Sequence, residues 1–339
     1  MSAFFLFVMT MVFYVIVFWI GSLGLDLVWS RTGIPIFAYY LYVAIGAYLT
    51  GLFSLPHVPL QNGVGNLFGL DMPGLLALPL AAVATGVIAM GIGAVFLRRL
   101  RTDYLAVVMV AVALVIWDFS QNDITLVSGN TGLTNIPLPL AGVLKININQ
   151  WTYLYTGVAL VWALALWWVM KTVSNSPTGR VFRAIRDDSV VAATIGKNVY
   201  RYQILSMGIG GFYAAIAGGF LAQLATSWNP SSWAPFEVFN VFTMVIVGGV
   251  GSNLGALVGA ALLQVLFIQG PTYVASNYLH SPTFETLAAA AIGVLMWLSL
   301  WFRPQGAVPE KLKPTKWYLG REPQLAESIN PDLTVEERA

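Results

Sequence analysis

Long apolar runs, separated by short polar stretches that contain glycine or proline, fill most of this 339-residue chain. A helix that crosses a bilayer needs about 20 mainly apolar residues. Runs of this kind predict spanning helices over roughly Ala3–Leu25, Ile34–Leu55, Gly74–Leu97, Tyr104–Leu126, Thr152–Met170, Tyr202–Thr226 and Thr286–Phe302. We therefore predict an all-α fold, a polytopic integral membrane helical bundle with about seven full spans.

One further apolar run, Val238–Gln269, is too long for a single span, and VGGVGSNLGA at residues 247–256 interrupts it. This pattern predicts two shorter helices joined by a glycine-rich break, a broken hairpin that brings the total to 8–9 helices. Non-helical backbone at membrane depth is tolerated where protein or a water-filled cavity satisfies it, so the break is a candidate for the lining of a pathway. A plain cytoplasmic turn between two full spans is the alternative. The candidate lining residues are Gly248, Gly249, Gly251 and Ser252.

The composition and charge agree with a membrane protein. Charged residues make up 9% of the chain, hydrophobic residues 58%, and the mean hydropathy is +0.74. Lysine and arginine cluster around Arg98, in the loop 171–201 and after Phe302, and such loops are cytoplasmic. The N-terminus is then expected outside and the C-terminus inside, with a transmembrane domain over 1–302 and a cytoplasmic tail over 303–339. A net charge of +2 without a basic face excludes a nucleic-acid partner.

Candidate chemistry is sparse. The chain has no cysteine, which excludes disulfides and thiolate metal sites, and no metal-binding motif is present. The cores of the predicted spans contain no ionisable residue, while Asp103, Asp118, Glu237 and Glu285 fall at span ends. The sequence also lacks a phosphate-binding loop and a nucleophile elbow. An enzyme is therefore not indicated, and energy for uphill transport must come from another chain.

The loop 171–201 carries the main charged motif, GRVFRAIRDDSVVAATIG at residues 179–196. Ser176-Pro177 is a helix-start signal and Gly196 a stop signal, so we expect one amphipathic helix between them. An Arg183 to Asp187 pair would add only a few tenths of a kcal/mol to it. The helix either lies on membrane lipid, with its arginines near anionic headgroups, or docks into a soluble partner and transmits that partner's motion.

Three segments resemble a known family. GRVFRAIRDDSVVAATIGKNVYRYQ, TMVIVGGVGSNLGALVGAALL and the external segment SGNTGLTNIP at residues 128–137 are similar to motifs of branched-chain amino acid ABC importer permeases of the LivM and LivH type. The start of the second span departs from the family pattern, because it reads RTGIPIFAYYLYVAIGAY with Pro35 and bulky aromatic residues.

The resemblance implies a permease in the inner membrane of a prokaryote, with no cofactor of its own. It implies a LivH-like second permease, two cytoplasmic ATPases that hold ATP and magnesium, and an extracytoplasmic solute-binding protein. The expected function is inward transport of branched-chain or other hydrophobic amino acids by alternating access. Importers of urea or short amides have similar permeases, and a passive channel would also lack charge in its spans, so both remain alternatives.

The same resemblance assigns residues to roles. The external motif would pass to Gly132 and Leu133, as a further part of the pathway. The ATPase-coupling role would pass to Gly179, Arg180, Arg183, Ala184, Arg186, Asp187, Asp188, Ala192, Ala193 and Gly196.

Overall fold

The fold comes from a computed structural model that describes residues 2–61, 64–66, 69–123, 127–141, 147–275, 282–303 and 305–310. Residues up to Pro309 form one compact unit. The predicted tail over 303–339 lies outside the described residues from position 311 onward.

The described chain is mainly helical. Its α-helices are α1 (Ser2–Leu25), α2 (Tyr39–Ser54), α3 (Gly74–Phe96), α4 (Thr102–Asn122), α7 (Ile148–Asn175), α8 (Pro177–Asp187), α9 (Ser189–Thr194), α10 (Val199–Ala225), α11 (Val238–Gly248), α12 (Asn253–Leu263), α13 (Gly270–Val274) and α14 (Pro282–Phe302). Its π-helical and 3-10 segments are η1 (Asp26–Arg31), η2 (Gly129–Thr131), η3 (Pro230–Trp233), η4 (Pro235–Glu237) and η5 (Gln264–Gln269). Two antiparallel ladders pair β1 (Val58–Gln61) with β2 (Val64–Asn66), and β3 (Leu133–Thr134) with β4 (Ser227–Trp228).

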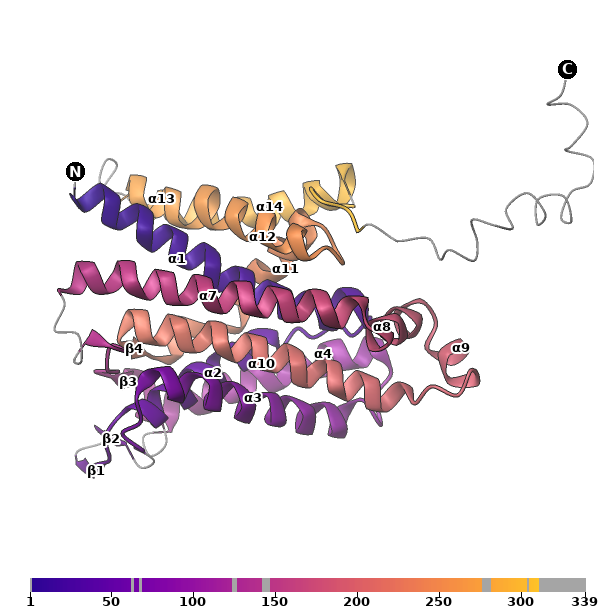
Figure 1. Ribbon diagram of the computed structural model, residues 1–339, viewed down its shortest axis with the longest axis horizontal. Coiled ribbons are helices and arrows are strands. Elements are labelled where there is room, and N and C mark those ends of the chain that lie inside the picture. Colours follow the sequence, from indigo (N-terminus) through magenta and orange to yellow (C-terminus); the bar gives the residue numbers. More distant parts are fainter. Residues whose placement is uncertain are drawn as a thin grey trace, which may run out of the picture. The chain divides into compact units, whose positions relative to one another are not determined.

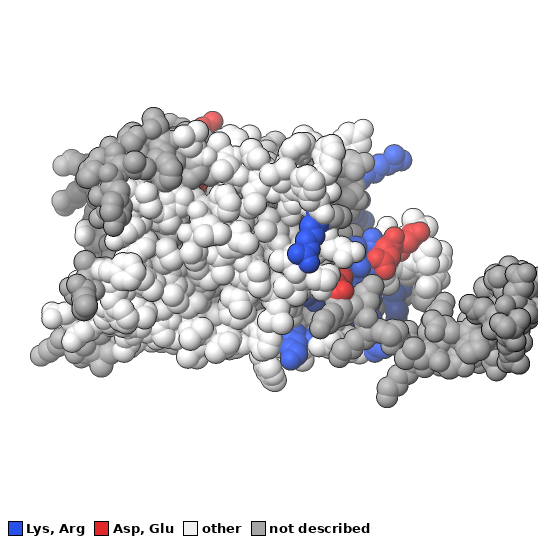
Figure 2. Space-filling view, turned by 90° about the horizontal axis from the view of Figure 1, so that it is seen from above, with Lys and Arg blue, Asp and Glu red and all other residues white. Residues whose placement is uncertain are grey.

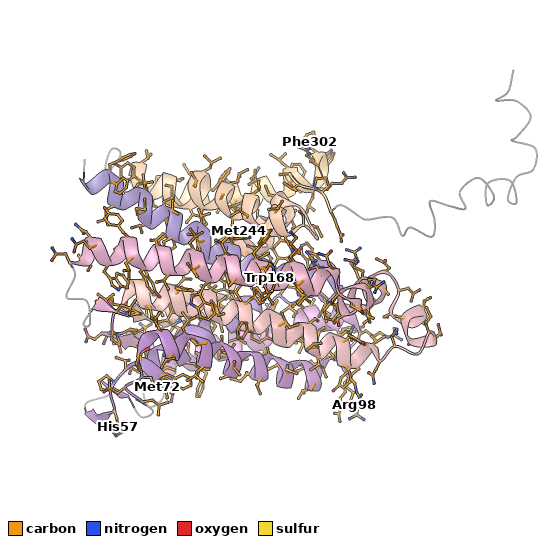
Figure 3. The ribbon with its side chains drawn as sticks, viewed as in Figure 1. His57, Met72, Arg98, Trp168, Met244 and Phe302 are labelled. Carbon is orange, nitrogen blue, oxygen red and sulfur yellow. The ribbon has the colours of Figure 1, made fainter. Side chains whose placement is uncertain are left out.

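The long helices lie side by side, with both small ladders at one end of the bundle and α8 and α9 at the other (Figure 1). Figure 3 places His57 at the ladder end and Arg98 at the opposite end. On the face shown in Figure 2, most charged side chains gather at the end that carries α8 and α9. We call this end, with Arg98, α8, α9 and Arg303, the basic end, and the opposite one the β end.

Most of the predicted spans are confirmed as helices. Within the described residues, six helices are long and apolar enough to cross a membrane: Phe4–Arg31, Gly74–Phe96, Tyr104–Asn122, Ile148–Asn175, Val199–Ala225 and Asn253–Val274. The chain is therefore a multi-pass membrane protein.

The predicted second span is shorter than expected. Residues 34–38 are not helical, and α2 begins only at Tyr39. Gly33 has φ +74°, which ends the preceding turn, and Pro35 has no amide hydrogen to donate to a helix. The sixteen residues of α2 extend about 24 Å, less than the roughly 30 Å of a hydrocarbon core.

Glycine and alanine bring α10 into close contact with its neighbours. A Cβ added at Gly218 would overlap the Val43 carbonyl of α2, and one at Gly211 would overlap the Ala89 side chain of α3. Such contacts let helix backbones approach in a membrane, where packing rather than the hydrophobic effect drives association. The core thus forms around α10, which packs on α1, α2 and α3.

Candidate coupling site

The first coupling helix, α8, is anchored to the bundle at its start. Ser176 caps it, with its Oγ accepting a hydrogen bond from the Gly179 amide at 3.3 Å, and Pro177 fills the first turn. This confirms the predicted start signal. Gly179 is buried, and a Cβ there would overlap the Ser174 carbonyl of α7. Phe182 and Ile185 are also buried, and the Phe182 ring meets Tyr202 of α10 edge-on.

The prediction of a single helix in this loop is wrong, because α8 ends at Asp187 and α9 begins at Ser189. Asp188 lies between them in an extended conformation, and its Oδ1 accepts hydrogen bonds from the amides of Val190 and Val191 at 2.8 and 3.0 Å. An aspartate in this position is a strong N-cap, and it starts a second helix. Gly196, with φ +80°, follows α9 and confirms the predicted stop.

The three arginines of α8 differ in their surroundings. Arg183 donates to the Ser174 carbonyl at 3.2 Å, and Arg186 donates to the Ser30 carbonyl of η1 at 2.8 Å. Arg180 is exposed. The expected Arg183 to Asp187 pair does not form, because Asp187 pairs with Arg186 at 3.2 Å. Two of the arginines therefore fix α8 to its own chain.

The short helix α9 presents an apolar surface. Val190, Val191 and Ile195 are 71%, 52% and 70% exposed, and they lie beyond the anchored α8 at the basic end. Ala192 is buried, while Ala184 and Ala193 are exposed. We call Val190, Val191 and Ile195 the α9 patch. Large apolar side chains exposed among charges at a water-facing end are typical of a protein contact surface.

A buried ion pair that the sequence analysis missed lies beside α8. Asp26 and Arg31, both in η1, are 0% and 4% exposed, and Arg31 Nε lies 3.0 Å from Asp26 Oδ2. Both residues lie just beyond the predicted first span, Ala3–Leu25, because the helical segment continues to Arg31. The signal was present in GLDLVWSR at the end of the first apolar run, where two opposite charges stand five residues apart.

The ion pair holds the glycine-rich break. Asp26 Oδ1 accepts from the Gly251 amide at 2.7 Å, while Arg31 Nη2 donates to the Gly251 carbonyl at 3.0 Å and to Asn253 Oδ1. Each charged group therefore binds both its partner and the break, which is the arrangement that makes a buried pair tolerable.

The break itself is confirmed, between Gly248 at the end of α11 and Asn253 at the start of α12. Gly249 and Gly251 have φ +126° and +81°, and both are buried. Ser252 caps α12, with its Oγ accepting from the Gly255 amide at 3.1 Å. Gly248 lies against the Gly255 backbone, where a side chain has no room.

The chain after α14 returns to the break. The amides of Ala307 and Val308 donate to the carbonyls of Val247 and Gly248, each at 2.9 Å. A continuous series of contacts therefore joins α8 to the break: Arg186 binds Ser30, the next residue Arg31 binds Asp26, and both charged residues bind Gly251. These contacts connect α8 to the break between α11 and α12.

The predicted external motif lies far from the coupling site, at the β end. Leu133 is buried and pairs with Trp228 in the β3–β4 ladder. Gly132 has φ +67°, and a Cβ there would overlap the Trp228 carbonyl. The motif thus fixes the loop before α7 to the end of α10.

Known proteins resemble this chain over most of its length. Residues 7–300 match the family described as branched-chain amino acid transport system / permease component. The chain is 26% identical to a probable branched-chain amino acid transport permease protein LivM of Methanocaldococcus jannaschii, over 87% of this chain and 91% of that protein. It is 25% identical to the high-affinity LivM permease protein of Escherichia coli, over 85% of this chain and 67% of that protein.

The second permease type also matches. The chain is 26% identical to the high-affinity branched-chain amino acid transport system permease protein LivH of Salmonella typhimurium, over 78% of this chain and 85% of that protein. No solved structure matches the chain significantly. Since the family match covers nearly the whole bundle, the chain belongs to the family of branched-chain amino acid transport system permease components.

Proposed function

We propose that this chain is the permease subunit of an ABC importer that moves branched-chain or other hydrophobic amino acids inward by alternating access. The observation that carries the proposal is the build of the coupling site: α8 is fixed to the bundle by Arg186 and Phe182, while the α9 patch beyond it is exposed. A partner protein that binds the exposed apolar surface of α9 can displace α8, and α8 transmits the displacement because it is fixed to the bundle.

The basic end faces the cytoplasm in this proposal, because arginine clusters at Arg98, in α8 and at Arg303 follow the positive-inside rule. Two ATPase subunits, which hold ATP and magnesium, dock there. A LivH-like permease completes the membrane unit, and a solute-binding protein delivers the amino acid at the β end. The LivM and LivH names of the similar proteins support the pairing of two permeases.

Coupling runs through the contacts at the basic end. Closure of the ATPases pushes α9, and α8 passes the motion through the Arg186 to Ser30 contact to η1 and the buried ion pair. Gly249 and Gly251 then act as the hinge between α11 and α12. The break is held by the ion pair on one side and by the segment at Val308 on another, so a shift of α8 that moves the ion pair also moves both helices.

Changing the α9 patch tests the proposal. In the variant Val190→Ser/Val191→Ser/Ile195→Ser we expect the ATPases to be lost on purification and ATP-driven leucine uptake to disappear. The stability of the permease should change by no more than about 0.5 kcal/mol, because these side chains are exposed. Uptake into proteoliposomes and co-purification from a strain that expresses the complete importer are the measurements.

A control replaces Leu70, which is 54% exposed in the loop before α3 at the β end, with serine. This control should keep the ATPases. Uptake that persists without ATP would indicate a passive channel, and uptake of urea or short amides in place of leucine would replace the substrate assignment. Retention of the ATPases by the α9 variant would refute the docking role.

A further inference from the structure

A cavity of about 340 Å³ lies halfway along the bundle, on the side where α1, α11 and the segments after the break meet α14 (Figure 1). Its lining includes Tyr14, Gln264 and Ile292. These residues lie near the midpoints of α1, of the continuous helical segment Asn253–Val274, and of α14. The cavity, which we call the central chamber, is therefore about equally far from both ends of the bundle.

Glu237 contributes a carboxylate to this chamber, a position that the sequence did not indicate. The sequence placed Glu237 at the end of a span, and it does directly precede α11. That helix has eleven residues and extends only about 16 Å from the break at the basic end, roughly half of a hydrocarbon core. The start of α11 therefore lies at mid-depth, and Glu237 with it. An ionisable group at this depth marks a functional site by default.

The Glu237 carboxylate has a neutral partner only. Asn240 Nδ2 donates to its Oε2 at 2.6 Å. Neither of the ion pairs seen in the described part of the chain, Asp26 with Arg31 and Arg186 with Asp187, involves Glu237. Glu237 is half-buried and lines the central chamber, so its carboxylate can accept a hydrogen bond from a group that enters the chamber.

Gln264 supplies a second, independent signal. It lines the chamber, it is 0% exposed, and neither its Nε2 nor its Oε1 has a hydrogen-bond partner among the described residues. Buried amides are normally satisfied, as Gln223 shows: its Oε1 accepts from Tyr155, and its Nε2 donates to the Gly74 carbonyl at 2.9 Å. Gln264 is thus a donor and an acceptor held ready for a group that enters the chamber.

The rest of the lining divides into two kinds. Phe18, Phe267 and Ile268 form an apolar wall together with Ile292, while Tyr40 and Thr272 add hydroxyl groups. A zwitterionic amino acid with an aliphatic side chain has the matching parts: an ammonium group, a carboxylate and a branched apolar group. Urea has no ammonium group for Glu237.

We propose that the central chamber is a binding site for the transported amino acid inside the membrane. Glu237 accepts the α-ammonium group, Gln264 Nε2 donates to the α-carboxylate, and the apolar wall around Phe267 takes the aliphatic side chain. This inference rests on the proposed function and names the class of substrate that the permease itself selects, a zwitterionic amino acid rather than a neutral amide.

The first test removes the charge with Glu237→Gln in the complete importer, reconstituted with binding protein and ATP. Leucine uptake should fall about tenfold or more, because a charge-assisted hydrogen bond to the substrate is lost. ATP hydrolysis stimulated by the binding protein should continue, because the coupling site is intact. The control is Asp118→Asn, which changes an exposed carboxylate on α4 and should leave uptake unchanged.

The second test compares two fully buried glutamines. Gln264→Leu should lower leucine uptake while leaving the thermal midpoint unchanged or raised, since it removes two unsatisfied polar atoms. Gln223→Leu should lower the thermal midpoint, since it leaves Tyr155 and the Gly74 carbonyl without their partner. A fall of both uptake and stability in Gln264→Leu would show a structural role and refute the assignment.

The absence of cysteine allows a direct test of occupancy. The single-cysteine variant Thr272→Cys, labelled with a charged thiol reagent in the complete importer, should be protected by leucine and not by urea. Labelling without protection would indicate a water-filled cleft only and would refute the inference.

The substrate-binding site and the importer function can be refuted separately. Wild-type leucine uptake in Glu237→Gln and Gln264→Leu, with ATP-driven uptake in the wild-type importer, refutes the binding site and leaves the proposed function intact. A wild-type importer that takes up no amino acid refutes both.

Discussion

Replacing Arg31 with methionine is expected to lower the free energy of unfolding by about 3–5 kcal/mol, the cost of leaving a buried charge without its partner. Asp26 is 0% exposed, and its Oδ2 loses the guanidinium at 3.0 Å. The Gly251 carbonyl and Asn253 Oδ1 lose a donor in the same step. Thermal unfolding in detergent measures the change, and leucine uptake should fall with it because the break is released.

Two controls isolate the charge. The double variant Asp26→Asn/Arg31→Met should be more stable than Arg31→Met alone, because it no longer buries an isolated carboxylate. Arg180→Met, which changes an exposed arginine on α8, should shift stability by no more than about 0.5 kcal/mol. If Arg31→Met were as stable as the wild type, the ion pair would have no role in holding the break.

Replacing Gly249 with valine is expected to have the second large effect, a loss of about 3 kcal/mol or more from backbone strain and overlap together. Gly249 has φ +126°, which a β-branched residue does not adopt without strain. A Cβ there would also overlap the Val308 carbonyl, so the segment after α14 must leave its hydrogen bonds to Val247 and Gly248. The yield of monodisperse protein, the thermal midpoint and leucine uptake should all decrease.

The matched control is Gly157→Ala in α7. Gly157 has ordinary helical φ, and a Cβ there meets nothing within 4 Å, so alanine should be neutral or slightly stabilising. A Gly249→Val protein with wild-type stability and uptake would show that the break is not packed in the way that Val308 indicates. Loss of uptake at unchanged stability would instead favour a direct role of the break in the pathway.

The start and the stop of the helical loop before α10 can be predicted from the sequence, because both signals depend only on neighbouring residues. Ser176-Pro177 starts α8 and Gly196 follows α9, as their chemistry predicts. Asp188 was equally readable as an N-cap, yet the apolar periodicity through Ile195 favoured one continuous helix. The N-cap signal decided the local backbone, and the two-helix form leaves the α9 patch uncovered.

The sites that require groups distant in sequence were out of reach of pattern analysis. In the sequence, Asp26 and Arg31 are only two charges after an apolar run. Their role in holding the break depends on Gly251, more than two hundred residues away. If α11 crossed the whole membrane, Glu237 would lie at the membrane surface, at the end of a span. Because α11 is only half that length, the same residue lines the cavity that Gln264 also lines.

The sequence by itself therefore determined what depends on local composition and spacing: a multi-pass helical bundle, the break at Gly249, the start of α8, and the motifs of the family. Apolar run length and capping chemistry carry that information without reference to the rest of the chain. The tertiary structure alone decided where charge can be buried and how deep each helix end lies, because both depend on which backbone groups pack together. It joined α8 to the break through Asp26 and Arg31, and it placed Glu237 in the lining of the same cavity as Gln264.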